Sequence, residues 1–170
     1  LGIKTVHVEA GLRSFNMSMP EEINRIVADH SSSYLFAPTQ ISMQNLENEN
    51  LISKSHLTGD IMVDTLKIAQ EKVEKKKQNI YQHKSEKYFL LTLHRPYNVD
   101  NSLNLLKIFN ELSKLSLKVI FPVHPRTFKI IEDNCLNIPD NFTVIKPVGY
   151  DDFVSLEINS EKIITDSGGI

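Results

Sequence analysis

The feature that most constrains the fold is a regular alternation of short β-rich runs with segments of helical character. Seven runs have the length and composition of buried strands, and they read KTVHV, YLFAP, SHLTG, KYFLLTL, KVIFPV, FTVIKP and KIITD. The segments between them begin near residues that suit a helix start, namely Pro20, Thr39, Asp60, Asp100, Arg126 and Tyr150. Such alternation is typical of an α/β chain with parallel sheets flanked by helices.

Both ends of the sequence look cut. Residue 1 opens directly into a β-type run, and the last residues, TDSGGI, stop at a glycine turn that should feed another element. We therefore expect a fragment, truncated at both ends. The length of 170 residues suits one domain or parts of two. The lysine-rich stretch 71–87 reads as a solvated helix end and a connection, so we expect the domain division between Thr58 and Lys87.

Composition argues against several classes of protein. With 41% hydrophobic residues, 24% charged residues and a net charge of −2, the chain has no electrostatic bias toward nucleic acid or anionic membranes. It lacks an apolar run of the roughly 18 residues that a membrane-spanning helix needs, and its first residues lack a secretion signal. Cys135 is the single cysteine, and no Cys/His cluster has metal-ligand spacing. We expect a soluble, cytoplasmic protein without a metal, in which Cys135 is inert.

The segment from His7 to Arg25, HVEAGLRSFNMSMPEEINR, looks like a site rather than a scaffold. It combines acids and cations with turn residues and has no amphipathic rhythm. Its carboxylates and its candidate phosphate or carboxylate partners are Glu9, Glu21, Glu22, Arg13 and Arg25.

Polar or glycine residues also follow three of the predicted strands. They are His94 and Arg95 after KYFLLTL, His124 and Arg126 after KVIFPV, and Ser167, Gly168 and Gly169 after KIITD. Because ligands bind at the carboxyl ends of parallel strands, these residues are expected to meet at one edge of a sheet. Glycines at such a turn allow the backbone to approach a phosphate.

Each of these signals also has a plain structural interpretation. A strand followed by SGG can be a turn without a ligand, and a histidine after a strand can be a structural residue. Glu9 and Glu21 can be ordinary surface carboxylates, and Phe153 can be a core residue on a helix. Taken singly, none of them defines a function.

In their order along the chain, the motifs are specific, and the chain resembles the UDP-N-acetylglucosamine 2-epimerase family over essentially its full length. The resemblance rests on HVEAGLRS, PEEINR, FAPT, TGD followed by IMVDTL, HRPYNVDN, FPVHPR, GYDDF and TDSGG. It implies two Rossmann-like lobes in the glycosyltransferase B arrangement, with a nucleotide sugar between them. Residues 1–60 would then be the later part of the N-terminal lobe, and residues 61–170 most of the C-terminal, UDP-binding lobe.

The resemblance also implies roles for individual residues. Glu9 and Glu21 match acid/base carboxylates, and His94 matches a catalytic histidine near the diphosphate. The residues that match substrate-binding positions are Ser167, Gly168 and Gly169 in the nucleotide-holding turn, Phe153 stacked on uracil, and Arg95 and His124 at a second, activating substrate molecule. Tyr97 stands where the family usually has a glutamate, and this departure removes a charge beside the diphosphate region.

The implied reaction is reversible epimerisation at C2 of UDP-N-acetylglucosamine. Loss of UDP from C1 acidifies the C2 hydrogen, a base removes it to give 2-acetamidoglucal, and a proton returns to the opposite face as UDP adds back. The route requires carboxylates on both faces of C2, and hydrogen bonds and positive charge at the departing diphosphate. It uses no NAD and no obligatory metal. The implied partners are a UDP-N-acetylhexosamine and a second copy of the chain in a homodimer.

Three other interpretations stay open at this point. A close relative would hydrolyse the substrate to free N-acetylmannosamine or epimerise a diacetamido uronic acid UDP-sugar. A glycosyltransferase of the same shape is disfavoured because transfer does not need carboxylates on both faces of C2. A non-catalytic nucleotide-sugar sensor is disfavoured by the presence of Glu9, Glu21 and His94. The segment alone is expected to be inactive, since further catalytic and ribose-binding residues of the family lie outside it.

Overall fold

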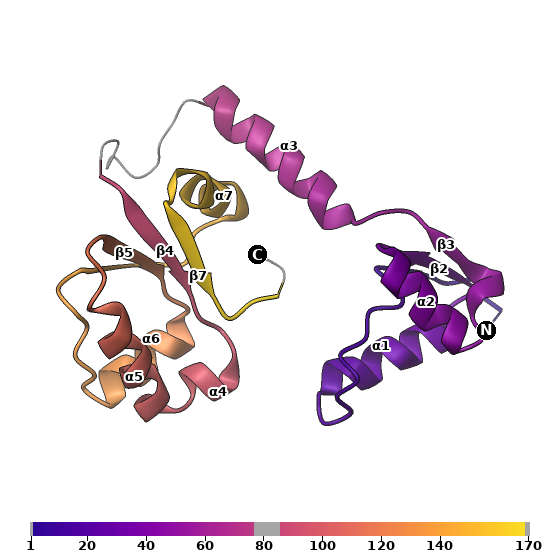
Figure 1. Ribbon diagram of the computed structural model, residues 1–170, viewed down its shortest axis with the longest axis horizontal. Coiled ribbons are helices and arrows are strands. Elements are labelled where there is room, and N and C mark those ends of the chain that lie inside the picture. The colour runs from indigo at the N-terminus through magenta and orange to yellow at the C-terminus, as the bar shows by residue number, and fades with distance from the viewer. Residues whose placement is uncertain (1, 77–85, 169–170) are drawn as a thin grey trace. The chain divides into compact units, whose positions relative to one another are not determined.

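The computed structural model describes residues 2–76 and 86–168, and these form two compact units, Leu1–Lys67 and Ile68–Ile170 (Figure 1). The division falls inside helix α3 (Ile61–Lys76). Each unit contains its own parallel sheet. The assignment of the units to two lobes of a larger enzyme stays a prediction.

The first unit is built around a three-stranded parallel sheet in the order β1-β2-β3. Its strands are β1 (Val6–Val8), β2 (Tyr34–Ala37) and β3 (Ser55–Leu57), and its helices are α1 (Pro20–Ser31), α2 (Gln40–Asn48) and the 3-10 turn η1 (Ile52–Lys54). Pro20 occupies the first turn of α1, where its missing N–H costs nothing. Thr39 caps α2 by accepting a hydrogen bond from the Ser42 amide at 3.1 Å.

The second unit has a four-stranded parallel sheet in the order β6-β5-β4-β7. Its elements are β4 (Tyr88–Thr92), α4 (Pro96–Val99), α5 (Ser102–Leu112), β5 (Lys118–Pro122), α6 (Pro125–Asp133), β6 (Phe142–Ile145), α7 (Tyr150–Asn159) and β7 (Lys162–Thr165). From β4 the chain adds β5 and β6 on one side and returns to place β7 on the other. The boundary between β4 and β7 is therefore a topological switch point, where α/β sheets bind ligands.

Apolar residues cover both faces of the second sheet. Leu91 and Leu93 belong to a cluster shared with Phe109 of α5 and Ile131 of α6. Tyr88 and Leu90, on the alternate positions of β4, join Leu156 of α7 in a second cluster. Figure 1 accordingly shows α7 on one face of the sheet and α5 and α6 on the other. A run such as YFLLT is apolar at nearly every position because both of its faces are buried.

The α/β class, the seven predicted strands and the helical segments between them are confirmed. The short helices α4 and η1 were not predicted, because HRPYNV and LISK carry turn residues and lack helical periodicity. The stretch 71–87 continues α3 as far as Lys76, and its residues 77–85 lie outside the described part of the chain.

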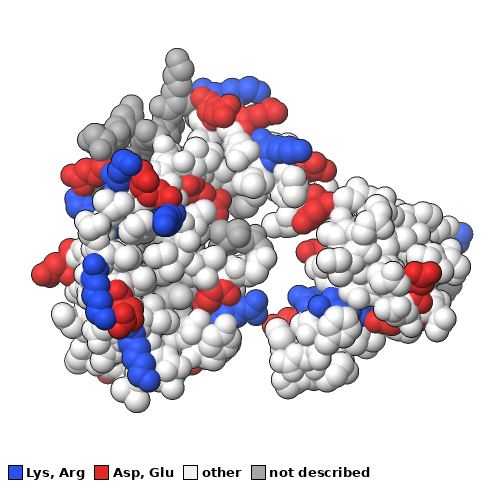
Figure 2. Space-filling model, in the orientation of Figure 1, with Lys and Arg blue, Asp and Glu red and all other residues white. Residues whose placement is uncertain are grey.

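The surface visible in Figure 2 carries acidic and basic side chains interspersed with one another, in line with the net charge of −2. Within the described residues, no helix is both long enough and apolar enough to cross a membrane. Cys135 is a free, exposed thiol just after α6, in a left-handed backbone conformation with φ of 49°.

Candidate active site

The switch point of the second sheet brings together two of the predicted motifs. His94 follows β4, and Asp166, Ser167 and Gly168 follow β7, so the two loops leave adjacent strand ends. The Nδ1 atom of His94 lies 2.8 Å from Oδ1 of Asp166. The Asp166 side chain is 7% exposed, whereas the His94 side chain is 53% exposed. The ring is therefore held through its Nδ1 atom, while about half of the side chain stays accessible to a ligand.

Asp166 also accepts hydrogen bonds from the loop after β4. The amides of His94 and Arg95 donate to its carboxylate at 3.1 Å and 2.9 Å, and the Asn98 side-chain amide donates at 2.9 Å. Burial by itself would raise the pKa of Asp166, but the hydrogen bonds from Asn98, Arg95 and His94 and the nearby imidazole together lower it. We call Asp166, His94, Arg95 and Asn98 the Asp166 network.

Ser167 and Gly168 are held by a second contact between the same strand ends. The hydroxyl groups of Thr92 and Thr165 lie 2.8 Å apart, and the Thr165 hydroxyl accepts a hydrogen bond from the Ser167 amide at 2.9 Å. A Cβ atom at Gly168 would have no heavy atom within 4 Å, so this position borders open space. Gly169, the third residue of the predicted turn, lies outside the described residues.

Arg95 and His124 occupy the ends of the neighbouring strands β4 and β5. The Arg95 Nε atom donates to the Asp166 carbonyl at 3.3 Å. The His124 Nδ1 atom accepts a hydrogen bond from the Arg126 amide at 3.2 Å and so caps α6. With Nδ1 acting as an acceptor, a proton on the His124 ring resides on Nε2. Arg126 is paired with Asp100 at 2.5 Å.

In the first unit, Glu9 follows β1 in a left-handed conformation with φ of 72°, which is unusual for a residue with a side chain. Glu21 lies in the first turn of α1. Both residues are exposed. Neither carboxylate forms a hydrogen bond or an ion pair with another residue of the described ranges 2–76 and 86–168.

Arg13, from the same segment, is buried and paired with Asp29 of α1. Arg13 and Asp29 are 2.7 Å apart, with side chains 1% and 0% exposed, and Arg13 also binds Glu49 at 2.6 Å. Asp29 further accepts from the Gly11 amide at 3.1 Å and contacts His7 Nδ1 at 2.6 Å. We call these residues the Asp29 network. Arg13 is therefore a carboxylate partner inside the unit and is not open to a phosphate.

Glu22 is likewise a structural residue. It is 1% exposed and accepts hydrogen bonds from the Ser14 amide at 2.8 Å, the Ser14 hydroxyl at 2.9 Å and the Phe15 amide at 2.9 Å. Arg25 lies 3.6 Å from it. Burial opposes ionisation of Glu22, but these hydrogen bonds outweigh it and lower its pKa. The carboxylate organises the loop that precedes α1.

Phe153 lies on α7 and packs, partly buried, against the apolar cluster of Tyr88, Leu90, Ile120 and Leu156. This placement agrees with the plain interpretation of an aromatic residue on a helix. Phe153 is only partly buried, and its stacking on uracil stays a prediction.

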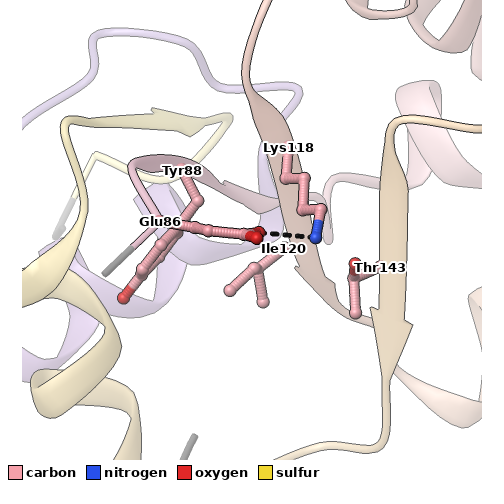
Figure 3. Close-up of a pocket in the computed structure, with 5 residues that line it drawn as sticks. All are labelled: Glu86, Tyr88, Lys118, Ile120 and Thr143. Atoms are coloured by element: carbon pink, nitrogen blue, oxygen red, sulfur yellow. Dashed lines mark hydrogen bonds and ion pairs between the residues drawn. The ribbon is translucent and has the colours of Figure 1, made fainter. Parts of the chain in front are cut away.

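A small pocket of the second unit lies at the opposite edge of the sheet, away from these residues. Glu86, Tyr88, Lys118, Ile120 and Thr143 line it, and all come from or just before the amino-terminal halves of their strands (Figure 3). An ion pair of 2.5 Å between Glu86 and Lys118 spans it. Burial raises the pKa of Tyr88 to about 12, and its hydroxyl donates to the Leu156 carbonyl at 2.8 Å. We interpret this pocket as part of the packing around α7, since Tyr88 and Ile120 belong to the same cluster as Leu156.

The sequence identified His94, Ser167 and Gly168, which the fold brings to one sheet edge, but it missed Asp166 and Asn98. Asp166 was visible within TDSGG, directly before the predicted turn, and Asn98 within HRPYN. Among the described residues, no group of three or more His, Cys, Asp and Glu side chains is arranged to hold a metal ion.

The fold and these residues define a Rossmann-like α/β protein whose polar groups gather at the carboxyl ends of parallel strands. The sequence profile of the UDP-N-acetylglucosamine 2-epimerase family matches residues 1–170, and the chain belongs to that family. The resemblance seen in the sequence is thereby confirmed.

Similar proteins include enzymes with two related substrates. A UDP-N-acetylglucosamine 2-epimerase of Methanococcus maripaludis is 47% identical over 100% of this chain and 50% of its own length. A UDP-2,3-diacetamido-2,3-dideoxy-D-glucuronate 2-epimerase of Pseudomonas aeruginosa is 38% identical over 100% of this chain and 48% of its own. The crystal structure of Methanocaldococcus jannaschii UDP-GlcNAc 2-epimerase in complex with UDP-GlcNAc and UDP matches with a TM-score of 0.87 and 43% identity, covering 98% of this chain and 49% of that one. The chain thus spans about half the length of these relatives.

Proposed function

We propose that the whole protein containing this chain is an isomerase that interconverts UDP-N-acetylglucosamine and UDP-N-acetylmannosamine without hydrolysing them. One observation carries the proposal. Arg13 and Glu22 of the His7–Arg25 segment are buried and paired, whereas Glu9 and Glu21 of the same segment stay exposed and without a partner among the described residues. Unpaired carboxylates are what proton transfer at C2 requires.

The reaction is an elimination followed by a re-addition. The C1–O bond to UDP breaks with its electron pair going to the diphosphate, and one carboxylate takes the C2 proton to leave 2-acetamidoglucal. A carboxylic acid then returns a proton to the other face of C2 as the diphosphate oxygen re-forms the bond to C1. Glu9 and Glu21 supply these acid and base groups.

The second unit binds the nucleotide. The turn at Ser167, Gly168 and Gly169 holds it, since the open space at Gly168 allows close approach of a phosphate. His94 stabilises the departing diphosphate through its exposed side. Phe153 stacks on uracil.

Further features of the whole protein follow from the same proposal. Arg95 and His124 contribute to binding a second, activating substrate molecule. The reaction needs no resident cofactor. We also propose that the enzyme is a homodimer in the cytoplasm, where the exposed thiol of Cys135 would stay reduced.

The proposal is tested on the full-length protein with UDP-N-acetylglucosamine in deuterated water, followed by proton NMR. We expect UDP-N-acetylmannosamine to form with deuterium at C2. Release of free N-acetylmannosamine would instead identify a hydrolysing enzyme. Absence of C2 exchange would reject epimerisation of this substrate and favour a glycosyltransferase or a nucleotide-sugar sensor.

The roles of the two carboxylates are tested by Glu9→Gln and Glu21→Gln. Each should lower turnover by about 10²-fold to 10⁴-fold while leaving UDP affinity nearly unchanged, because proton transfer is lost and nucleotide contacts are kept. Glu47→Gln, on the exposed side of α2, is the matched control and should keep wild-type turnover. Equal losses of affinity and turnover would contradict acid/base roles.

A second candidate substrate is the UDP-linked diacetamido uronic acid. The observation that favours it is the 38% identity to the Pseudomonas aeruginosa epimerase of that sugar. Turnover of this sugar with C2 exchange, when UDP-N-acetylglucosamine shows none, would select it.

A further inference from the structure

We propose that Asp166 is a positioning residue for His94, which fixes the ring proton on Nδ1 and thereby presents Nε2 to the diphosphate of the nucleotide sugar. This inference rests on the proposed function for the identity of the ligand. The placement of the ring rests on the Asp166 network alone.

The contacts of Asp166 specify a carboxylate. Its Oδ1 atom faces the His94 amide at 3.1 Å and His94 Nδ1 at 2.8 Å. Its Oδ2 atom faces the Arg95 amide at 2.9 Å and the Asn98 side-chain amide at 2.9 Å. The two backbone partners can only donate, so both oxygens must accept. An asparagine in this place would direct its NH₂ group at one of these backbone N–H groups.

The geometry of the ring follows from that requirement. Because Asp166 is ionised, as its lowered pKa indicates, the Nδ1 atom of His94 must carry a hydrogen to donate to it. In the neutral ring the lone pair is then on Nε2, and in the protonated ring Nε2–H is a donor. In both forms Nε2 is the ring nitrogen that has no hydrogen-bond partner among the described residues, and the side chain that carries it is 53% exposed.

The same carboxylate connects the histidine to the nucleotide-holding turn. Asp166 is followed in the chain by Ser167, whose amide donates a hydrogen bond to the Thr165 hydroxyl. The backbone carbonyl of Asp166 accepts a hydrogen bond from Arg95 Nε at 3.3 Å. Thr165 in turn contacts Thr92 on β4. The loop at 94–98 and the turn at 166–168 are thus joined by side-chain and backbone contacts, which fixes His94 relative to the turn.

The experiment compares variants of the full-length protein. Asp166→Asn removes the carboxylate with almost no change in volume. Asn98→Ala removes one of the four donors and leaves the contact between His94 and Asp166. Asp133→Asn makes the same chemical change as the first variant at the exposed end of α6 and serves as the matched control.

Four quantities are measured for each protein. They are kcat and KM for UDP-N-acetylglucosamine, the Kd for UDP by calorimetry, and the His94 tautomer by ¹⁵N NMR of histidine-labelled protein, with the His94 signals assigned by comparison with His94→Gln. For Asp166→Asn we expect kcat to fall about 10²-fold, the UDP Kd to change less than about 3-fold, and Nδ1–H to be lost from the neutral ring. Asn98→Ala should lower kcat less and keep Nδ1–H. Asp133→Asn should match the wild type.

The outcomes separate this inference from the proposed function. A wild-type spectrum with the proton of the neutral His94 ring on Nε2 would overturn the inference whether or not Asp166→Asn folds. An unchanged kcat in Asp166→Asn would overturn it too, and so would a loss of UDP binding as large as the loss in kcat, which would indicate a structural role. If the wild type shows Nδ1–H but no C2 exchange with any sugar tested, the proposed function fails while the positioning of the ring stands.

Discussion

The Asp29 network of the first unit and the Asp166 network of the second contain similar contacts but differ in how far they are buried. In each, an aspartate with a buried side chain accepts from at least one backbone amide and contacts Nδ1 of a histidine that follows or lies in a strand. Asp29 is also paired with the buried guanidinium of Arg13, and its histidine, His7, is 23% exposed. The carboxylate of Asp166 is paired with the ring of His94, and that side chain is 53% exposed.

Burial decides whether a carboxylate–histidine pair is closed off or open to a ligand. Where a guanidinium enters the interior, as Arg13 does, the network is satisfied by buried groups and holds a loop to a helix. Where the histidine is the partner and stays exposed, one ring nitrogen is left for a ligand. Perturbing the first network should therefore change stability, and perturbing the second should change chemistry.

The largest effect on stability is expected for Arg13→Met. It removes a guanidinium that is 1% exposed and leaves Asp29 without its buried cation, so the free energy of unfolding should fall by about 3–5 kcal/mol. Urea denaturation followed by circular dichroism measures it. Arg126→Met is the control, because the Arg126 side chain is 62% exposed and its pair with Asp100 should contribute no more than about 1 kcal/mol. Equal losses in the two variants would remove the proposed contrast.

Two glycine substitutions come next in size. Gly11→Ala should cost about 1–3 kcal/mol, because φ is 79° and a Cβ atom would lie 2.4 Å from the Ser42 carbonyl oxygen. Gly168→Ala should cost less than about 1 kcal/mol, because nothing lies within 4 Å of its Cβ position, but it should weaken UDP binding. Thermal unfolding and calorimetry with UDP test the pair. The contrast is wrong if Gly168→Ala is the less stable variant or binds UDP normally.

A pH dependence of stability should follow from the first unit. The hydrogen bond from Arg13 lowers the pKa of Glu49 in the folded state from its ordinary value of 4.5, and the pKa of Glu22 is lowered as well. A depressed folded pKa contributes stability that is fully present above about 4.5 and is lost as the pH falls through the folded value. Melting temperatures between pH 7 and pH 3 should therefore fall below about pH 4.5, and less steeply in Glu49→Gln. An equally steep fall in that variant would exclude Glu49 as a cause.

The smallest effect on stability is expected for Tyr97→Glu. Tyr97 is 66% exposed on α4, so the free energy of unfolding should change by no more than about 0.5 kcal/mol. The substitution restores the acid that is usual in the family beside the Asp166 network. If activation by a second substrate molecule depends on that acid, the dependence of rate on UDP-N-acetylglucosamine should become more sigmoidal. A hyperbolic curve in both proteins would show that Tyr97 does not govern activation.

Much of the fold could be predicted because its signals are local. Apolar runs of strand length and capping residues such as Pro20 and Thr39 act within a few positions, so the seven strands and most helices could be read in order. The contacts of the two networks are not local. Asp29 lies 18 positions from Gly11 and Asp166 lies 72 positions from His94, and no periodicity connects them.

The α/β class, the order of the elements and the family could be read from the sequence alone, because hydrophobic pattern and motif order are properties of the sequence. Which charged residues of the His7–Arg25 segment are exposed could be learned only from the folded chain. Glu21 and Glu22 are adjacent and chemically equivalent, yet Glu22 is buried beneath the Ser14 loop while Glu21 faces solvent. The physical reason is that the ionisation and availability of a carboxylate depend on its burial and its donors, and these come from residues that folding brings near.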